Sequence, residues 1–144
     1  MQGAVLAAAL ARLRAAPALI EPRTDRIRIA HRTSVSREKT PAIHVVPLDV
    51  TTNGNVGSDC VRRTLTFAVR IFGRSDGGIA DIDALIVDVL ARLRPAADDG
   101  IPYPGGVIVQ EPRRVRFQED DADEDVAFSE FEVTADYTSA EWSI

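Results

Sequence analysis

The sequence is poor in the residues on which most enzymes and secreted domains depend. It contains one cysteine, Cys60, so no internal disulfide can form and folding does not require an oxidising compartment. Its two histidines, His31 and His44, have no catalytic partner at a recognisable spacing. We therefore expect both histidines to be structural or solvated, and Cys60 to be a buried or half-buried apolar residue.

Long apolar runs and nucleotide-binding motifs are also missing. No stretch approaches the roughly 20 apolar residues of a membrane span. Arg12 and Arg14 interrupt the apolar N-terminal segment, so we expect a cytoplasmic start and not a signal peptide. The glycine pairs at 77–78 and 105–106 fit neither GxGxxG nor the P-loop pattern. These absences favour a binding or assembly module with no cofactor and no membrane contact over an enzyme.

Charge is divided unevenly along the 144 residues, a length typical of one domain. Counting Lys and Arg against Asp and Glu, residues 1–40 carry 8 − 3 = +5, residues 41–95 carry 6 − 6 = 0, and residues 96–144 carry 3 − 13 = −10. Such asymmetry suits a protein that meets copies of itself or differently charged partners. The alternative is that both ends are merely solvated.

Apolar spacing predicts two helices, over 4–14 and 79–94, and the second has one continuous apolar stripe. Alternation predicts strands over 26–30, 42–50, 61–72, 107–117 and 126–137. We expect the helical stripe to pack on the apolar face of the third strand, joining Ile82, Leu85, Ile86, Val89 and Leu93 to Val61, Leu65, Phe67, Val69 and Ile71. The element order predicts a single α+β domain over 1–144, with a mostly antiparallel sheet and two packed helices.

Several details of the strands and loops also follow from the sequence. Pro47 restricts its strand to an edge position or a bulge, and a change of apolar phase suggests a bulge near Ser129–Glu130. Segments 21–40 and 51–59 lack apolar anchors and are rich in Arg, Thr, Gly and Asn. We expect them to be flexible loops that become ordered on assembly.

A run of six carboxylates in seven residues separates the last two predicted strands. Because it repels itself, we expect a solvated hairpin tip. Three of its aspartates have the opening spacing of an EF-hand loop, but Val126 stands where that loop needs glycine and strands flank it, so no metal site is expected. The run is a candidate interface or channel lining, formed by Glu119, Asp120, Asp121, Asp123, Glu124 and Asp125.

Two basic groups are further interface candidates. Arg113, Arg114 and Arg116 precede the acidic run, and could meet the acidic run of a neighbouring copy, or phosphate. The alternative is that they balance Glu111 and Glu119 locally. The second group is a candidate assembly loop formed by Arg26, Arg28, Arg32, Arg37 and Lys39.

An N-terminal helix is followed by four characteristic segments: PAIHVVPL at Pro41–Leu48, RTLTFAVRIFG at Arg63–Gly73, IADIDALIVDVLARL at Ile79–Leu93, and DADEDVAFSEFEVTADY at Asp121–Tyr137. In the order and residue character of these elements the chain resembles the tail terminator (tail-completion, minor tail protein U-like) family of long-tailed bacteriophages. The resemblance covers nearly the whole chain, although the arginine-rich segment 21–40 has no clear counterpart.

The resemblance implies a structural protein with no reaction and no cofactor. Such terminators form a homo-hexameric ring that caps the tail tube, stops its polymerisation and supplies the head-joining surface. The implied partners are the tail tube protein and a head-completion or connector protein, with genome DNA passing through the ring without specific binding. The implied location is the head-proximal end of the tail, after assembly in the host cytoplasm.

Two other functions remain open. One is a different head–tail joining or tail-tube protein of similar fold. The other is a small α+β ligand-binding domain or hydrolase, which would need a convergent polar pocket that the sequence does not show.

Overall fold

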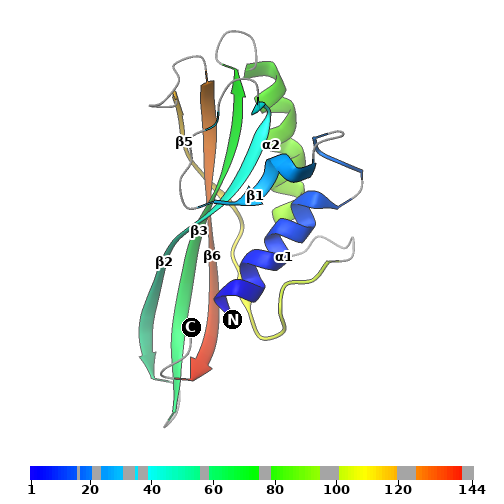
Figure 1. Cartoon of the computed structure of the whole chain (residues 1–144). Coiled ribbons are helices and arrows are strands. Elements are labelled where there is room, and N and C mark those ends of the chain that lie inside the picture. The colour runs from blue at the N-terminus through cyan, green and yellow to red at the C-terminus, as the bar shows by residue number, and fades with distance from the viewer. Residues whose placement is uncertain are drawn as a thin grey trace.

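In the computed structural model, two helices lie on one face of a twisted sheet, so the fold is α+β (Figure 1). The structure describes residues 1–15, 17–20, 24–30, 35, 39–55, 59–74, 79–94, 101–119 and 126–140. The helices are α1 (Gln2–Arg14) and α2 (Ile79–Leu93), and a 3-10 turn, η1 (Thr24–Arg26), precedes the sheet. The strands are β1 (Ile27–Ile29), β2 (Ala42–Asn55), β3 (Cys60–Arg74), β4 (Ile108–Val109), β5 (Arg113–Glu119) and β6 (Val126–Ala140).

The six-stranded sheet is mostly antiparallel, as the element order predicted. Its order is β1-β2-β3-β6, and β4 and β5 both pair with the outer edge of β6. Only the short β1 runs parallel to its neighbour, β2. The predicted strand over 107–117 is two strands, β4 and β5, which both pair with β6. Pro112 lies between them and interrupts this pairing, because it has no backbone N–H to donate.

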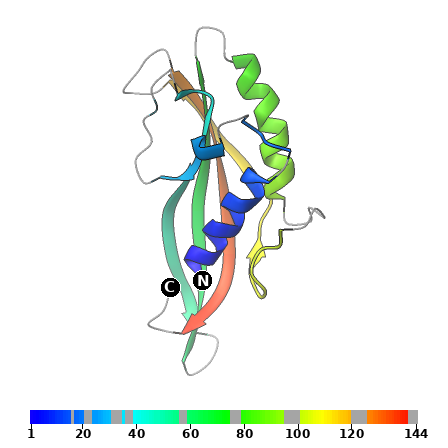
Figure 2. The same ribbon diagram turned by 45° about the vertical axis from the view of Figure 1, so that its right-hand side comes forward.

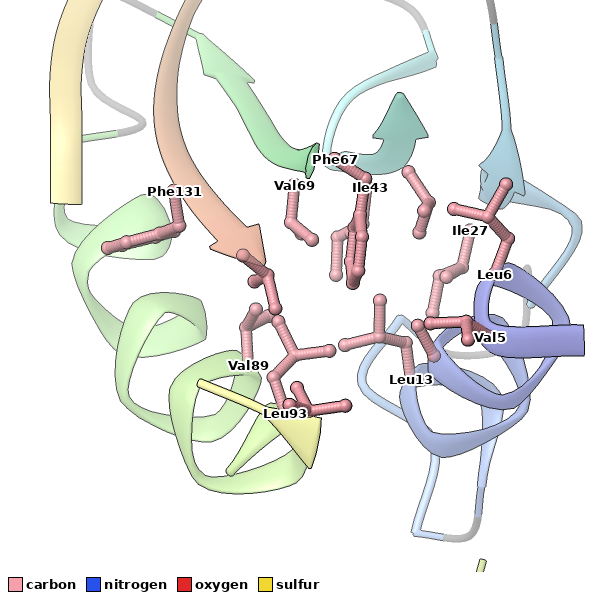
Figure 3. Close-up of a cluster of buried hydrophobic side chains, with 14 of the residues drawn as sticks. Val5, Leu6, Leu13, Ile27, Ile43, Phe67, Val69, Val89, Leu93 and Phe131 are labelled. Atoms are coloured by element: carbon pink, nitrogen blue, oxygen red, sulfur yellow. The ribbon is translucent and has the colours of Figure 1, made fainter. Parts of the chain in front are cut away.

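The main core lies between the helices and the sheet (Figure 3). Ile82, Val89 and Leu93 of α2 are buried against the apolar face of β3, and the half-buried Leu85 and Ile86 pack beside them. The predicted contact between these two faces is therefore confirmed. The face of β3 within this cluster begins at Leu65 and ends at Ile71; Val61 is buried but lies outside it.

Strand β2 is longer than the sequence predicted, because two irregularities hide its alternation. Register shifts between Pro47 and Asp49 and between Thr52 and Gly54 interrupt its pairing with β3. The first shift returns Val50 to the helix-facing side, opposite Leu65. The prediction of a loop from residue 51 is wrong up to Asn55, because the ends of β2, β3 and β6 extend beyond the helices, where polar residues suit a strand (Figure 1).

The predicted bulge in β6 is also wrong. β6 pairs with β3 in one unbroken register from Val126 to Ala140, and the bulge lies in β5, between Arg114 and Arg116. The apolar phase changes because the start of β6 is buried on both faces. Phe131 joins the core under the helices, whereas Phe128 joins a second cluster on the opposite face with Val35, Ala42, Phe72 and Val126.

Segment 21–40 has apolar anchors that the sequence interpretation missed. Ile27 of β1 is fully buried in the main core, and Val35 is buried in the second cluster. Arg26 donates a hydrogen bond to the carbonyl oxygen of Thr40 at 3.1 Å, and Arg14 donates one to that of Ile27 at 2.7 Å. The flexibility of this segment stays a prediction.

The C-terminal ends of the two helices meet, and an arginine from each binds the backbone of the other. Arg12 of α1 is buried and donates to the carbonyl oxygens of Arg92, Arg94 and Ile101 at 3.2, 2.7 and 2.7 Å. Its guanidinium carbon lies 3.9 Å from the ring centroid of Tyr103. In return, Arg92 of α2 donates to the carbonyl oxygens of Arg12, Leu13, Ala15 and Pro17.

We call this arrangement the arginine clamp, formed by Arg12, Arg92 and Tyr103. The last carbonyl groups of a helix have no partner within the helix and carry the negative end of its dipole. Each arginine therefore supplies donors and positive charge where the other helix lacks them.

The clamp predicts a large effect for the change Arg12→Met. It removes three hydrogen bonds to part-buried carbonyl groups, and we expect the free energy of unfolding to fall by roughly 2–4 kcal/mol. Arg12→Lys should recover little, because an ammonium group cannot reproduce the planar fork of donors stacked on Tyr103.

Arg94→Met is the matched control. Arg94 is exposed and its bond to Glu111 is a surface pair at 3.7 Å, so the change should cost less than about 1 kcal/mol. Urea unfolding of the three variants provides the measurement. Equal losses for Arg12→Met and Arg94→Met would show that the clamp contributes no more to the free energy of unfolding than a surface ion pair does.

Candidate interaction surfaces

The face of the sheet opposite the helices carries a row of ionisable residues. Arg28 of β1, His44 of β2, Arg70 of β3 and Glu130 of β6 occupy successive paired positions, and Arg116 of β5 is paired with Glu130 in register. The row crosses the sheet beside the second apolar cluster. Polar positions of separate strands thus come together on one face, which no short motif could have revealed.

At the centre of the row lies a buried ion pair. Arg70 Nε donates to Glu130 Oε1 at 2.8 Å, and the two side chains are only 16% and 7% exposed. The guanidinium carbon of Arg70 also lies 5.2 Å from the ring centroid of Phe128. The sequence interpretation did not foresee the burial of this pair.

His44 is buried beside this ion pair in the neutral form. Its ring centroid lies 5.0 Å from that of Phe72, and its Nδ1 has no hydrogen-bond partner among the described residues. Burial, followed by the positive charges of Arg28 and Arg70, lowers the pKa of His44 from 6.5 to about 4. The expectation of a structural histidine is confirmed for His44, whereas His31 lies outside the described residues.

Cys60 differs from its predicted place. It is exposed, because it is the first residue of β3 and lies at the end of the sheet that extends beyond the helices. Its backbone partner in register is Ala140 of β6.

The arginines before the acidic run lie on β5 at the outer edge of β6. Arg113 approaches Glu132 at 3.5 Å, and its side chain is 77% exposed. This partner differs from the two carboxylates proposed for a local balance: Glu111 instead pairs with Arg94 at 3.7 Å. Arg114 and Arg116 are opposite Phe131 and Glu130 in register.

An open hollow lies beside Arg113. Its lining supplies carboxylate, guanidinium, amide and hydroxyl groups from Gln110, Glu111, Arg113, Glu132 and Thr134. The structure places Glu119 at the end of β5, opposite Ala127. The rest of the acidic candidates, Asp120, Asp121, Asp123, Glu124 and Asp125, lie outside the described residues.

The candidate assembly loop is divided between internal contacts and exposed charge. Arg26 bonds within its own segment, as described above. Arg28 and Lys39 are exposed, and Arg32 and Arg37 lie outside the described residues. Within the described ranges, no three His, Cys, Asp or Glu side chains are grouped as a metal site would require, and no helix is long and apolar enough to cross a membrane.

Comparison with known proteins identifies the fold. No protein-family model and no curated protein matches the sequence. Among solved structures, a chain of the "Virion of native gene transfer agent (GTA) particle" matches with a TM-score of 0.61 and 14% identity, over 95% of this chain and 96% of that chain. The two chains share a fold. Because the match spans almost all of both, the common fold is that of the whole domain.

The buried pair predicts different costs for two arginine changes. Arg70→Met removes the guanidinium that bonds the buried carboxylate of Glu130 and should lower the free energy of unfolding by roughly 3–5 kcal/mol. Arg113→Met removes an exposed pair and should cost less than about 1 kcal/mol.

The double variant Arg70→Met/Glu130→Leu completes the test by urea unfolding. Replacing both charges by apolar side chains should recover most of the stability lost in Arg70→Met. A double variant as unstable as the single one would contradict this account of the pair.

His44 predicts a stability loss in mild acid. Its folded pKa lies below the unfolded value, so the unfolded chain binds the proton more readily and stability falls as the pH drops from about 6.5 towards 4. The lowered pKa corresponds to roughly 3 kcal/mol. His44→Phe should remove this contribution, as measured by urea unfolding between pH 7.5 and 4. Parallel losses in the variant and the unchanged protein would refute it.

Proposed function

We propose that this chain is a structural protein of a phage or phage-derived particle and acts as a tail terminator. The observation that supports this most strongly is the whole-domain likeness to a chain in the virion of a gene transfer agent. The sequence resemblance to tail terminators points to the same class of particle. The chain would then work by assembly, without catalysing a reaction and without a cofactor.

The finer parts of the proposal concern arrangement in the particle. Copies of the chain form a closed homo-oligomeric ring, with six subunits, that caps the tail tube at its head-proximal end. The ring ends tube polymerisation and provides the surface for a head-completion or connector protein, while genome DNA passes through its centre. Heterologous contacts that repeat around the ring fit the unequal charge of the two ends of the chain.

The acidic run at 119–125 has two possible roles in such a ring. Facing the lumen, it would repel the DNA backbone and let the duplex slide, over a range of about 10 Å at 0.1 M salt. Facing outwards, it would steer docking onto a basic surface of the connector or tube.

Loss of the gene distinguishes a terminator from other tail proteins of similar fold. Without a terminator, tubes should grow to uncontrolled lengths and remain unattached to heads. Loss of a tube protein would leave no tails, and loss of a joining protein would leave unattached tails of normal length. Electron microscopy of particles from a deletion strain, complemented by the intact gene as control, provides the measurement.

In the same strain, a variant with Asp120, Asp121, Asp123 and Asp125 changed to Asn separates the two roles of the acidic run. A lumenal run predicts normal head joining with slower DNA ejection, and a docking run predicts tails that fail to join heads. Normal joining and normal ejection together would reduce the run to a solvated loop. Tails of normal length in the deletion strain would contradict the terminator proposal itself.

A further inference from the structure

The outer side of α2 is an unpartnered surface with an apolar centre. While Ile82, Val89 and Leu93 face the core, the opposite side of the helix exposes Asp83, Val87 and Asp88. Val87 is 67% exposed, more than any other large apolar side chain in the described part of the chain. Neither aspartate takes part in an ion pair formed among the described residues.

The arginine clamp leaves this surface with a net negative charge. Residues 79–91 contain three aspartates and no cation, so they carry 0 − 3 = −3. The nearest cation along the helix, Arg92, is held against the carbonyl groups at the end of α1. Its charge is therefore used inside the domain, and the outer face of α2 is left acidic around an exposed valine.

The edge of the sheet at β1 has the opposite character. β1 is the terminal strand, and two of its three residues, Arg28 and Ile29, are exposed. Ile29 is 37% exposed, and Lys39 adds an exposed cation to the same segment. Residues 21–40 carry 6 − 3 = +3. Side chains alternate along a strand, so the β1 edge presents the exposed Ile29 on the same side as the buried Ile27 and the exposed Arg28 on the opposite side.

The two surfaces lie on opposite sides of the molecule. In Figure 2, β1 is to the left of the central strands and α2 is to the right, with α1 between them. Surfaces placed in this way can be joined only between different copies. A contact between two α2 faces, or between two β1 edges, would bring like charges together, so complementarity favours a head-to-tail arrangement.

We propose that α2 of one copy packs on the β1 edge of the next, and that this contact repeats to build the ring. Val87 meets Ile29 of the neighbour, and Asp83 and Asp88 face its Arg28 and Lys39. The partner is thus a second copy of this chain. The inference rests on the proposed function for its ring geometry, but the contact itself follows from the two surfaces.

Charge reversal on one side at a time tests the contact. The first variant, Asp83→Lys/Asp88→Lys, makes the α2 face basic; the second, Arg28→Glu/Lys39→Glu, makes the β1 edge acidic. Each variant alone should associate at least about tenfold more weakly than the unchanged protein, because every contact then joins like charges.

A one-to-one mixture of the two variants should restore assembly. The basic α2 face of the first then meets the acidic β1 edge of the second, and the acidic α2 face of the second meets the basic edge of the first. Alternating copies satisfy every contact in a ring with an even number of subunits. Native mass spectrometry of the purified protein and copy counts in assembled particles provide the two readouts.

Matched controls reverse exposed charges elsewhere on the sheet. Asp49→Lys on β2 and Arg62→Glu on β3 should leave association unchanged within about twofold. Urea unfolding must show that each variant is folded; if the double change at the β1 edge unfolds the chain, Lys39→Glu alone replaces it.

An independent test joins the proposed neighbours covalently. In a Cys60→Ser background, Val87→Cys together with Ile29→Cys should give an oxidation-dependent ladder of linked copies, whereas either cysteine alone should not.

Reversed variants that assemble normally, a mixture as weak as its components, or a chain that stays monomeric both alone and with tail tubes would overturn the contact. Overlong tails after gene deletion combined with a failed mixture would reject this contact while leaving the terminator function intact. Tails of normal length after gene deletion, combined with restored assembly in the mixture, would reject the terminator function alone.

Discussion

The position of the two helices depends on how the carbonyl groups at their C-terminal ends are satisfied. Both helices end at the same place, so their dipoles present negative ends to each other, an unfavourable arrangement unless cations lie between them. Arg12 and Arg92 are those cations, and each binds the backbone of the opposite helix. The clamp fixes the pair of helices as a unit over the apolar face of β2, β3 and β6.

The two faces of the sheet differ in composition and in what covers them. One is covered by the helices and is apolar over most of its length. The other combines a small apolar cluster around Phe72 and Phe128 with the ionisable row from Arg28 to Glu130. Burying Arg70 and Glu130 together costs desolvation of both charges, and their direct bond offsets that cost. Such a pair tolerates only one alignment of β3 with β6, and so it helps to fix their register.

The sequence predicted the elements that rest on local periodicity. The stripe of α2 and the alternation of β3 are regular over many residues, and both predictions were confirmed, as was their mutual packing. Pattern-based interpretation failed where one residue changes the phase. The shift after Pro47 made the end of β2 resemble a loop, and the burial of both Phe128 and Phe131 imitated a bulge. Val35 was missed because a single apolar residue among polar neighbours has no period.

The candidate surfaces show a similar division. Sequence alone identified Arg28 and Lys39 as possible contact residues because they stand in a basic segment. It did not identify the outer face of α2, because Asp83 stands near the helix start, where a carboxylate complements the dipole, and the exposure of Val87 and Asp88 is not visible in the pattern. The clamp was equally hidden: Arg12 and Arg92 are 80 residues apart, and a basic last turn predicts only a favourable charge, not its acceptor on another helix.

The irregular outer part of β2 also limits how copies of this domain can join. From Val46 to Asn55 no described strand pairs with its outer edge, which would ordinarily invite a neighbour to extend the sheet without end. Pro47 offers no donor there, and the two shifts in register break the even spacing of the remaining groups. An added strand would find no continuous ladder to follow. The outer edge of β2 therefore disfavours the strand-by-strand addition that builds fibres, while the side-chain surfaces of the domain can still form assemblies of finite size.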